Sequence, residues 1–114
     1  MNIIYHNPNW SKSRKSVEIL ENSGIHYNII KYLVDTPSKE QIKNIAKMLN
    51  LRPKEFIRKG EKDFKENNLA SITDNDELLI EKMIEFPKII ERPIIIIEGK
   101  GVIGRPPENI LEIL

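Results

Sequence analysis

Strand-like and helical patterns of apolar positions alternate along the first third of this 114-residue chain. Residues 2–5 and 27–33 are rich in β-prone side chains, whereas Val17 and Leu20 between them fall on one face of a helix. Gly24 is suited to the left-handed cap that would end this helix. Strand, helix and strand in this order predict a βαβ unit, in which two parallel strands are joined by a right-handed crossover.

The middle of the chain has helical patterns without strand patterns. One helix is predicted to open within residues 36–40, with Thr36 as its N-cap and Pro37 in its first turn. Further helical pieces are predicted near residue 53, over residues 62–67 and over residues 75–85. Together they form a predicted helical insert of about residues 37–90.

The last part of the chain returns to strands. The β-branched run from Pro93 to Ile97 fits a strand that is covered on both faces. A turn at residues 98–101 and a short strand at 102–103 predict a β-hairpin, and residues 107–114 predict a closing helix. The order βαβ, helical insert, ββα predicts an α/β fold with a mixed sheet, in a single domain over residues 1–114.

Composition narrows the class of protein further. Hydrophobic residues make up 39% and charged residues 31% of the chain, which is typical of a globular domain. Neither a signal peptide nor a membrane-spanning run is recognisable, so a cytoplasmic location is expected, without membrane binding. Lys and Arg number 18 against 17 Asp and Glu, a balance that gives no electrostatic footprint for nucleic acid. No cysteine is present, and the two distantly spaced histidines indicate no metal site.

The segment between the first strand and the first helix reads HNPNWSKSR at positions 6–14. It resembles the active-site loop of the glutaredoxin-dependent arsenate reductases, whose pattern is His-Asn-Pro-x-Cys-x-x-Ser-Arg. Further segments that match this family in order are Arg58-Lys59-Gly60, residues 91–95 and residues 103–108. The resemblance covers nearly the whole chain and is closest to the short members of the family. It implies a thioredoxin-like fold.

An oxyanion site is what this resemblance implies for the chain. Three arginines converge on arsenate and arsenite in the family, and by motif match they are Arg58, Arg92 and Arg105. A loop that leads into a helix N-terminus also presents free N–H groups and the positive end of the helix dipole to an anion. The resemblance further implies that Pro93 is a cis-proline facing the loop. The remaining loop residues that it assigns are Asn7, Pro8 and Arg14.

Trp10 stands where the family motif has its nucleophilic cysteine. In the family reaction a thiolate attacks arsenate, glutathione then joins, and glutaredoxin resolves the mixed disulfide. His6, Ser13 and the helix N-terminus would lower the pKa of that thiol. Because an indole has no thiolate, the resemblance implies a redox-inactive, arsenate reductase-like protein that retains at most a site for arsenate, phosphate or sulfate. No tightly bound cofactor is expected; glutathione is the family co-substrate, glutaredoxin the family partner, and a monomer is expected.

Three explanations for Trp10 stay open. The chain is a natural relative that has lost catalysis, a variant altered at this position, or a protein whose natural residue is misreported. Cysteine and tryptophan codons differ only at the third base, and the codon between them, UGA, can encode selenocysteine. The codon in the native gene would separate these explanations.

Two alternatives come from other functional classes. Spx-type regulators use the same fold to bind RNA polymerase, but they carry Cys-x-x-Cys at this loop, where the present chain has Trp10 and Ser13. A protein-binding module that uses an exposed Trp10 as an aromatic anchor is the other alternative.

Overall fold

The computed structural model describes residues 2–114, and the chain divides into two compact units. One unit combines Met1–Asp35 with Arg92–Leu114, and the other is Thr36–Glu91. The second unit therefore begins and ends within one residue of the predicted helical insert. That the whole chain behaves as a single domain stays a prediction.

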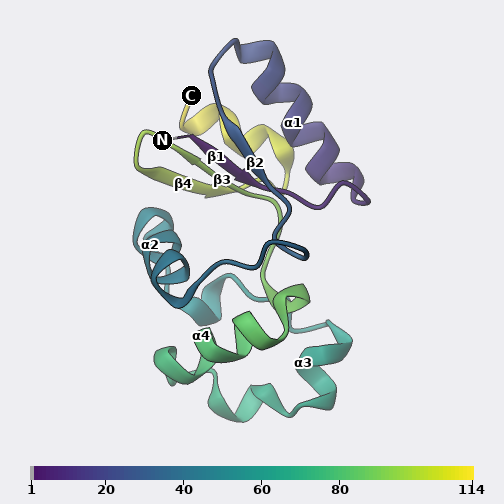
Figure 1. Ribbon diagram of the computed structural model, residues 1–114, viewed down its shortest axis with the longest axis vertical. Helices are drawn as coiled ribbons and strands as arrows, with labels where there is room; N and C mark the ends of the chain where they lie inside the picture. Colours follow the sequence, from purple (N-terminus) through teal and green to yellow (C-terminus); the bar gives the residue numbers. More distant parts are fainter. Residues whose placement is uncertain (1) are drawn as a thin grey trace. The chain divides into compact units, whose positions relative to one another are not determined.

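A four-stranded mixed sheet in the order β2-β1-β3-β4 forms the centre of the first unit (Figure 1). Strand β1 (Ile3–Tyr5) is parallel to β2 (Asn28–Ile30) and antiparallel to β3 (Ile94–Ile97), which is antiparallel to β4 (Lys100–Ile103). Helix α1 (Ser11–Ser23) connects β1 to β2. The predicted βαβ unit, the hairpin and the mixed thioredoxin-like sheet are thereby confirmed.

The elements of this unit end partly where the sequence predicts and partly earlier. Gly24 ends α1 in the left-handed region with φ 76°, as predicted. Strand β2 stops at Ile30 rather than near residue 33, because the chain turns there and buries Tyr32. The closing helix, Pro107–Glu112 (η4), is a 3-10 helix and ends earlier than predicted.

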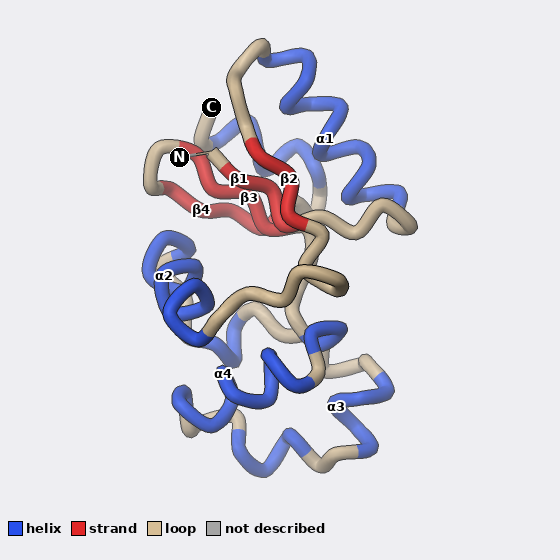
Figure 2. The backbone as a smooth tube through the Cα atoms, in the orientation of Figure 1, coloured by secondary structure: helices blue, strands red, loops and turns tan. Residues whose placement is uncertain are grey.

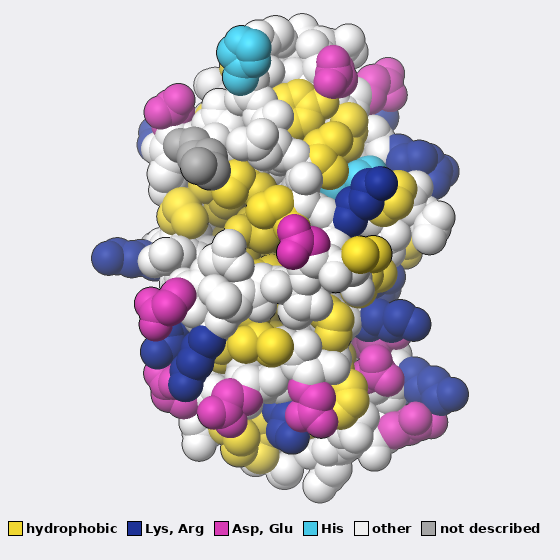
Figure 3. Space-filling model, in the orientation of Figure 1, with side chains coloured by type: hydrophobic (Ala, Val, Ile, Leu, Met, Phe, Trp, Pro, Cys, Tyr) yellow, Lys and Arg dark blue, Asp and Glu magenta, His cyan; other side chains and the backbone are white. Residues whose placement is uncertain are grey.

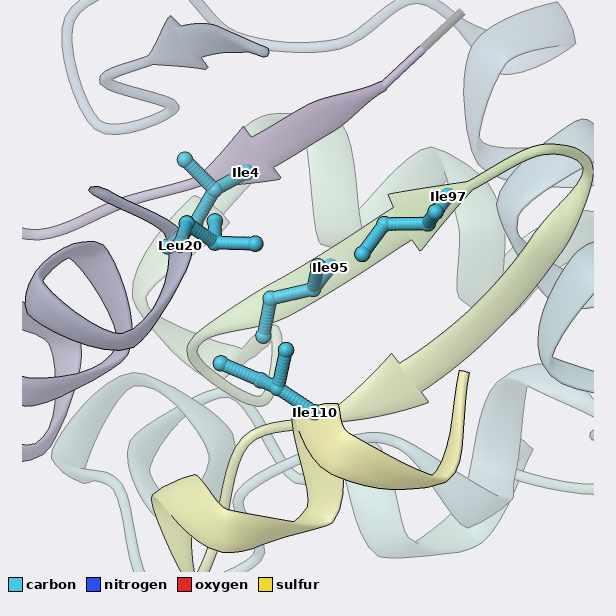
Figure 4. Close-up of a cluster of buried hydrophobic side chains, with 5 residues drawn as sticks. All are labelled: Ile4, Leu20, Ile95, Ile97 and Ile110. Atoms are coloured by element: carbon cyan, nitrogen blue, oxygen red, sulfur yellow. The ribbon is translucent and has the colours of Figure 1, made fainter. Parts of the chain in front are cut away.

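A buried cluster holds α1 and the closing helix against the same face of the sheet (Figure 4). Ile4 on β1 faces Leu20 of α1, and Ile110 of the 3-10 helix approaches Ile95 on β3. Ile97 completes the cluster, and each of these five side chains is at most 5% exposed. Burying a side chain of this size contributes about 1.5–3 kcal/mol relative to leaving it in water. All four residues of β3 are buried, as the β-branched run predicts for a strand covered on both faces.

The regular elements of the second unit are helices, as predicted, and they appear in blue in Figure 2. An isolated antiparallel bridge also joins Ile57 to Ile90. The α-helices of this unit are α2 (Lys39–Leu49), α3 (Lys62–Glu66) and α4 (Asp76–Glu85), and its 3-10 helices are η1 (Pro53–Glu55), η2 (Leu69–Ile72) and η3 (Pro87–Ile89). Helix α4 contacts α2 and all three 3-10 helices. It supplies buried apolar side chains to this core, namely Leu79, Ile80 and Met83.

The start of α2 corrects the predicted cap. Ser38, not Thr36, is the N-cap: its hydroxyl accepts a hydrogen bond from the Gln41 N–H at 3.2 Å, and its own N–H donates to the Gln41 side chain at 2.8 Å. This reciprocal pair satisfies two backbone groups at once, which Thr36 could not do because Lys39, three residues after it, has no hydrogen-bond acceptor.

The surface carries both signs of charge. On the face drawn in Figure 3, Lys and Arg side chains are interspersed with Asp and Glu. This mixture agrees with the formal net charge of +1. Within residues 2–114, no helix combines the length and apolarity needed to cross a membrane.

Candidate functional site

Strand pairing gathers three separate segments at one end of the sheet. Tyr5, Ile94 and Ile103 are neighbours across β1, β3 and β4. The loop after Tyr5, the residues before Ile94 and those after Ile103 therefore leave the sheet side by side. A hydrogen bond from the Gly104 N–H to the Pro93 carbonyl, 2.9 Å long, extends the hairpin by one more pair.

The loop after β1 is tied to the first turn of α1 by a buried network. Nδ1 of His6 lies 2.6 Å from the hydroxyl oxygen of Ser13, and the Asn7 N–H donates to that oxygen at 3.0 Å. His6, Asn7 and Ser13 are 7%, 8% and 0% exposed. Since the oxygen already accepts from Asn7, the Ser13 hydroxyl can donate its proton to Nδ1 of a neutral His6, which leaves the ring proton on Nε2.

Burial is the main cause that lowers the pKa of His6, and the positive charges of Lys31 and Arg14 add to it. A lowered pKa means that the folded state binds this proton less readily than the unfolded state. The stabilisation is thus complete above the unfolded pKa of about 6.5 and is lost as the pH falls through the lower folded pKa.

Acidification should therefore destabilise the protein through His6. Between about pH 7.5 and about pH 5, the melting temperature of the native chain should fall more than that of His6→Asn, whose amide oxygen can still accept from Ser13. Thermal melts followed by circular dichroism would measure this difference. His26→Asn removes the other, exposed histidine and should behave like the native chain. An equal fall in His6→Asn would contradict the assignment.

The N-terminus of α1 opens at this loop. Trp10 is the N-cap residue, it makes no side-chain cap hydrogen bond, and the first turn contains no acidic residue. The loop itself is braced by hydrogen bonds from the Trp10 N–H to the Asn7 carbonyl at 3.0 Å and from Arg14 Nη1 to the Pro8 carbonyl at 3.1 Å. The dipole of this 13-residue helix places partial positive charge beside Trp10.

Two arginines stack on the indole of Trp10. The guanidinium carbon of Arg92 lies 4.3 Å from the ring centroid, and that of Arg105 lies 4.9 Å from it. Both distances are within the range of a cation–π interaction, about 6 Å. Arg92 is buried, with 8% exposure, whereas Arg105 is exposed. The peptide bond before Pro93 is cis, the isomer that the resemblance implies, and the bond between Arg105 and Pro106 is cis as well.

Two further residues, Asn109 and Gly104, fix the backbone on either side of Arg105. The side-chain amide of Asn109 donates to the carbonyls of Ile103 at 3.1 Å and Arg105 at 3.2 Å. Gly104 packs so tightly that an added Cβ would lie 2.8 Å from the Ser16 hydroxyl oxygen. Gly104 lies in the segment 103–108 that matches the family, so the sequence indicates its importance. No sequence pattern indicates the role of Asn109.

Arg58 belongs to the second unit, where carboxylates surround it. Its Nη1 lies 2.8 Å from a carboxylate oxygen of Glu61, and its Nε lies 4.0 Å from one of Glu91. Its backbone N–H donates to the Ile89 carbonyl at 2.7 Å. The structure thus brings Arg92 and Arg105 together at Trp10, while the convergence of Arg58 with them stays a prediction.

The assembled groups suit anion binding better than covalent chemistry. Two guanidinium groups and a helix N-terminus are the donors that proteins direct at oxyanions. Arginine keeps its charge across physiological pH, so such a site would not be switched off by titration. The part of the chain described, residues 2–114, contains no group of three or more His, Asp or Glu residues that could hold a metal ion.

A βαβ unit, an antiparallel hairpin and a cis-proline beside the loop that opens α1 define the class of this protein as a thioredoxin-like domain. A model of the ArsC family matches residues 5–113, and the chain belongs to this family. The arsenate reductase of Haemophilus influenzae is 41% identical over 113 residues, which cover 98% of this chain and 97% of that protein.

Other relatives agree over similar lengths. The uncharacterized Escherichia coli protein YfgD is 39% identical over 112 residues, 97% of this chain and 94% of that protein. The structure of an arsenate reductase from Vibrio cholerae matches with a TM-score of 0.94 and 45% identity, and the match covers 99% of this chain and 97% of that one. The resemblance found in the sequence is confirmed at the level of family and fold.

Proposed function

We propose that this chain is an oxyanion-binding member of the ArsC family that does not reduce arsenate by the thiol route. The absence of cysteine from all 114 residues carries this proposal. The family reaction, as the resemblance implies it, begins with a thiolate that attacks arsenate, and position 10 has an indole in its place. Neither an N-terminal turn nor a neighbouring histidine can turn an indole into such a nucleophile.

The anion-binding part of the proposal is supported by charge and geometry at one end of the sheet. Arg92 and Arg105 meet at Trp10, and Trp10 caps α1. A tetrahedral oxyanion would accept hydrogen bonds from the in-plane N–H groups of the guanidiniums and from free N–H groups of the first helical turn. Arsenate, phosphate and sulfate share this shape and charge, so the site should accept all three.

Arg92→Gln should weaken sulfate binding about tenfold, because it removes a charged donor, which is worth on the order of 1.5 kcal/mol. Isothermal titration calorimetry with sodium sulfate would measure the dissociation constant. Lys100→Gln is the matched control, because it removes one positive charge from an exposed position at the far end of β4 from Arg105.

Two results of these titrations would contradict the proposal. Equal losses in the two variants would mean that sulfate senses only net charge, and no measurable heat with the native chain would mean that no anion site exists. Glutathione and glutaredoxin, the co-substrate and partner of the family reaction, would act only on a variant that regains a thiol. Specific retention of RNA polymerase by the native chain would favour the regulatory alternative.

A further inference from the structure

The contact between Trp10 and its two arginines has a consequence for the anion site. The three residues reach one another from different segments: Trp10 from the loop before α1, Arg92 from the entry to β3 and Arg105 from the exit of β4. A single indole therefore contacts both cationic side chains that the proposed function uses.

Stacking on an aromatic ring does not itself use the hydrogen-bond donors of a guanidinium. These donors lie in the plane of the group, whereas the ring attracts the cation through its negatively polarised face. An oxyanion approaches guanidinium edges in that same plane, so the ring and the anion use different parts of each arginine. The indole can then remain in place while an anion binds.

The ring also lowers the cost of bringing two like charges together. Both guanidinium groups lie within 5 Å of one centroid, so their like charges repel each other. A long arginine side chain loses considerable rotamer freedom when it is fixed in one place. Attraction to the indole offsets part of both costs before binding, and the exposed Arg105 should depend on it more than the buried Arg92.

We infer that Trp10 is a positioning residue, whose indole holds Arg92 and Arg105 in the arrangement that receives an oxyanion. The inference rests on the proposed function and deepens it. In this role Trp10 does not serve as an exposed anchor for a protein partner. Position 10, at the N-terminus of α1, then orients two cationic donors and takes no part in bond making.

Two variants at position 10 distinguish the effect of the aromatic ring on anion binding from the effect of side-chain volume. Trp10→Phe keeps an aromatic face, whereas Trp10→Leu keeps apolar volume without one. In calorimetric titrations with sodium sulfate, Trp10→Phe should bind within about threefold of the native chain, and Trp10→Leu should bind about five- to tenfold more weakly. Thermal melts of both variants show whether they are folded. Binding by Trp10→Leu as tight as that of the native chain, or tighter, would overturn the inference.

A measurement without any anion keeps this inference separate from the proposed function. The Nε–Hε signals of Arg92 and Arg105 in NMR spectra should be shifted by the ring current in the native chain and in Trp10→Phe. This ring-current shift should disappear in Trp10→Leu, where the exposed Arg105 should approach its random-coil position more closely than the buried Arg92. If the native chain shows this pattern but binds no sulfate, the proposed function fails while the stacking is real. Random-coil positions for both arginines in the native chain would overturn the positioning role itself.

Discussion

Replacing Trp10 with cysteine should raise the rate of arsenate reduction on the order of 10³-fold or more over the native chain, since losing a nucleophile costs other enzymes up to about 10⁶-fold. A thiol at the N-cap of α1 would meet the positive end of a helix dipole, which lowers the pKa of a cysteine. Arg92 and Arg105 reach position 10 in the native chain and would supply positive charge for arsenate, although without the indole they would be held less firmly. The rate would be measured as arsenite formed in the presence of glutathione and glutaredoxin.

Trp10→Ser is the matched control for this gain. It has nearly the shape of the cysteine variant but lacks the sulfur, so it should stay at the rate of the native chain. Arsenite production by both variants would mean that removal of the indole, rather than the new thiol, opens a different route. Failure of Trp10→Cys alone, in a folded protein that still binds sulfate, would mean that the remaining site is not competent for the chemistry.

The second large effect that we expect is a loss of folding stability. Gly104→Ala should lower the free energy of unfolding by roughly 1–3 kcal/mol, the usual cost of overpacking a well-filled interior. An added Cβ would lie 2.8 Å from the Ser16 hydroxyl oxygen and 2.9 Å from side-chain carbons of both Ile95 and Pro93. These neighbours are buried, so none can move aside without disturbing α1, β3 or the cis-proline. Urea unfolding at equilibrium would measure the change.

Gly60→Ala tests whether this cost is particular to Gly104. An added Cβ at Gly60 meets nothing within 4 Å, so this substitution should leave stability unchanged or raise it by a few tenths of a kcal/mol. Similar losses at the two positions would show that glycine removal in general, and not the close packing beside Ser16, causes the destabilisation.

Much of the fold was predictable because local pattern and tertiary environment agree. The run of isoleucines in β3 has the buried environment that its composition predicts. The cap of α2 was predictable too, since Ser38 is followed by Gln41 in the spacing of a capping box, a signal that Thr36 lacks. The 3-10 form of the closing helix was not predictable from periodicity, nor were the hydrogen bonds by which Asn109 in this helix donates to carbonyls that precede it.

The site was only partly predictable. Motif spacing indicated the importance of Arg92 and Arg105, but their meeting depends on the antiparallel pairing of β3 with β4. Their stacking on Trp10 follows from long side chains whose directions are fixed only in the folded state. Of the carboxylates beside Arg58, Glu61 is the N-cap of α3 and lies only three residues along the chain. Glu91 approaches Arg58 through the bridge between Ile57 and Ile90, a pairing that no sequence pattern indicates.

Arsenite formation by the native chain is the measurement that tests the central claim most directly. With arsenate, glutathione and glutaredoxin supplied in excess, the protein containing Trp10 should produce no more arsenite than a reaction without it. Production that rises in proportion to the concentration of this cysteine-free protein would contradict the account, because the reduction would then need no thiol from the chain.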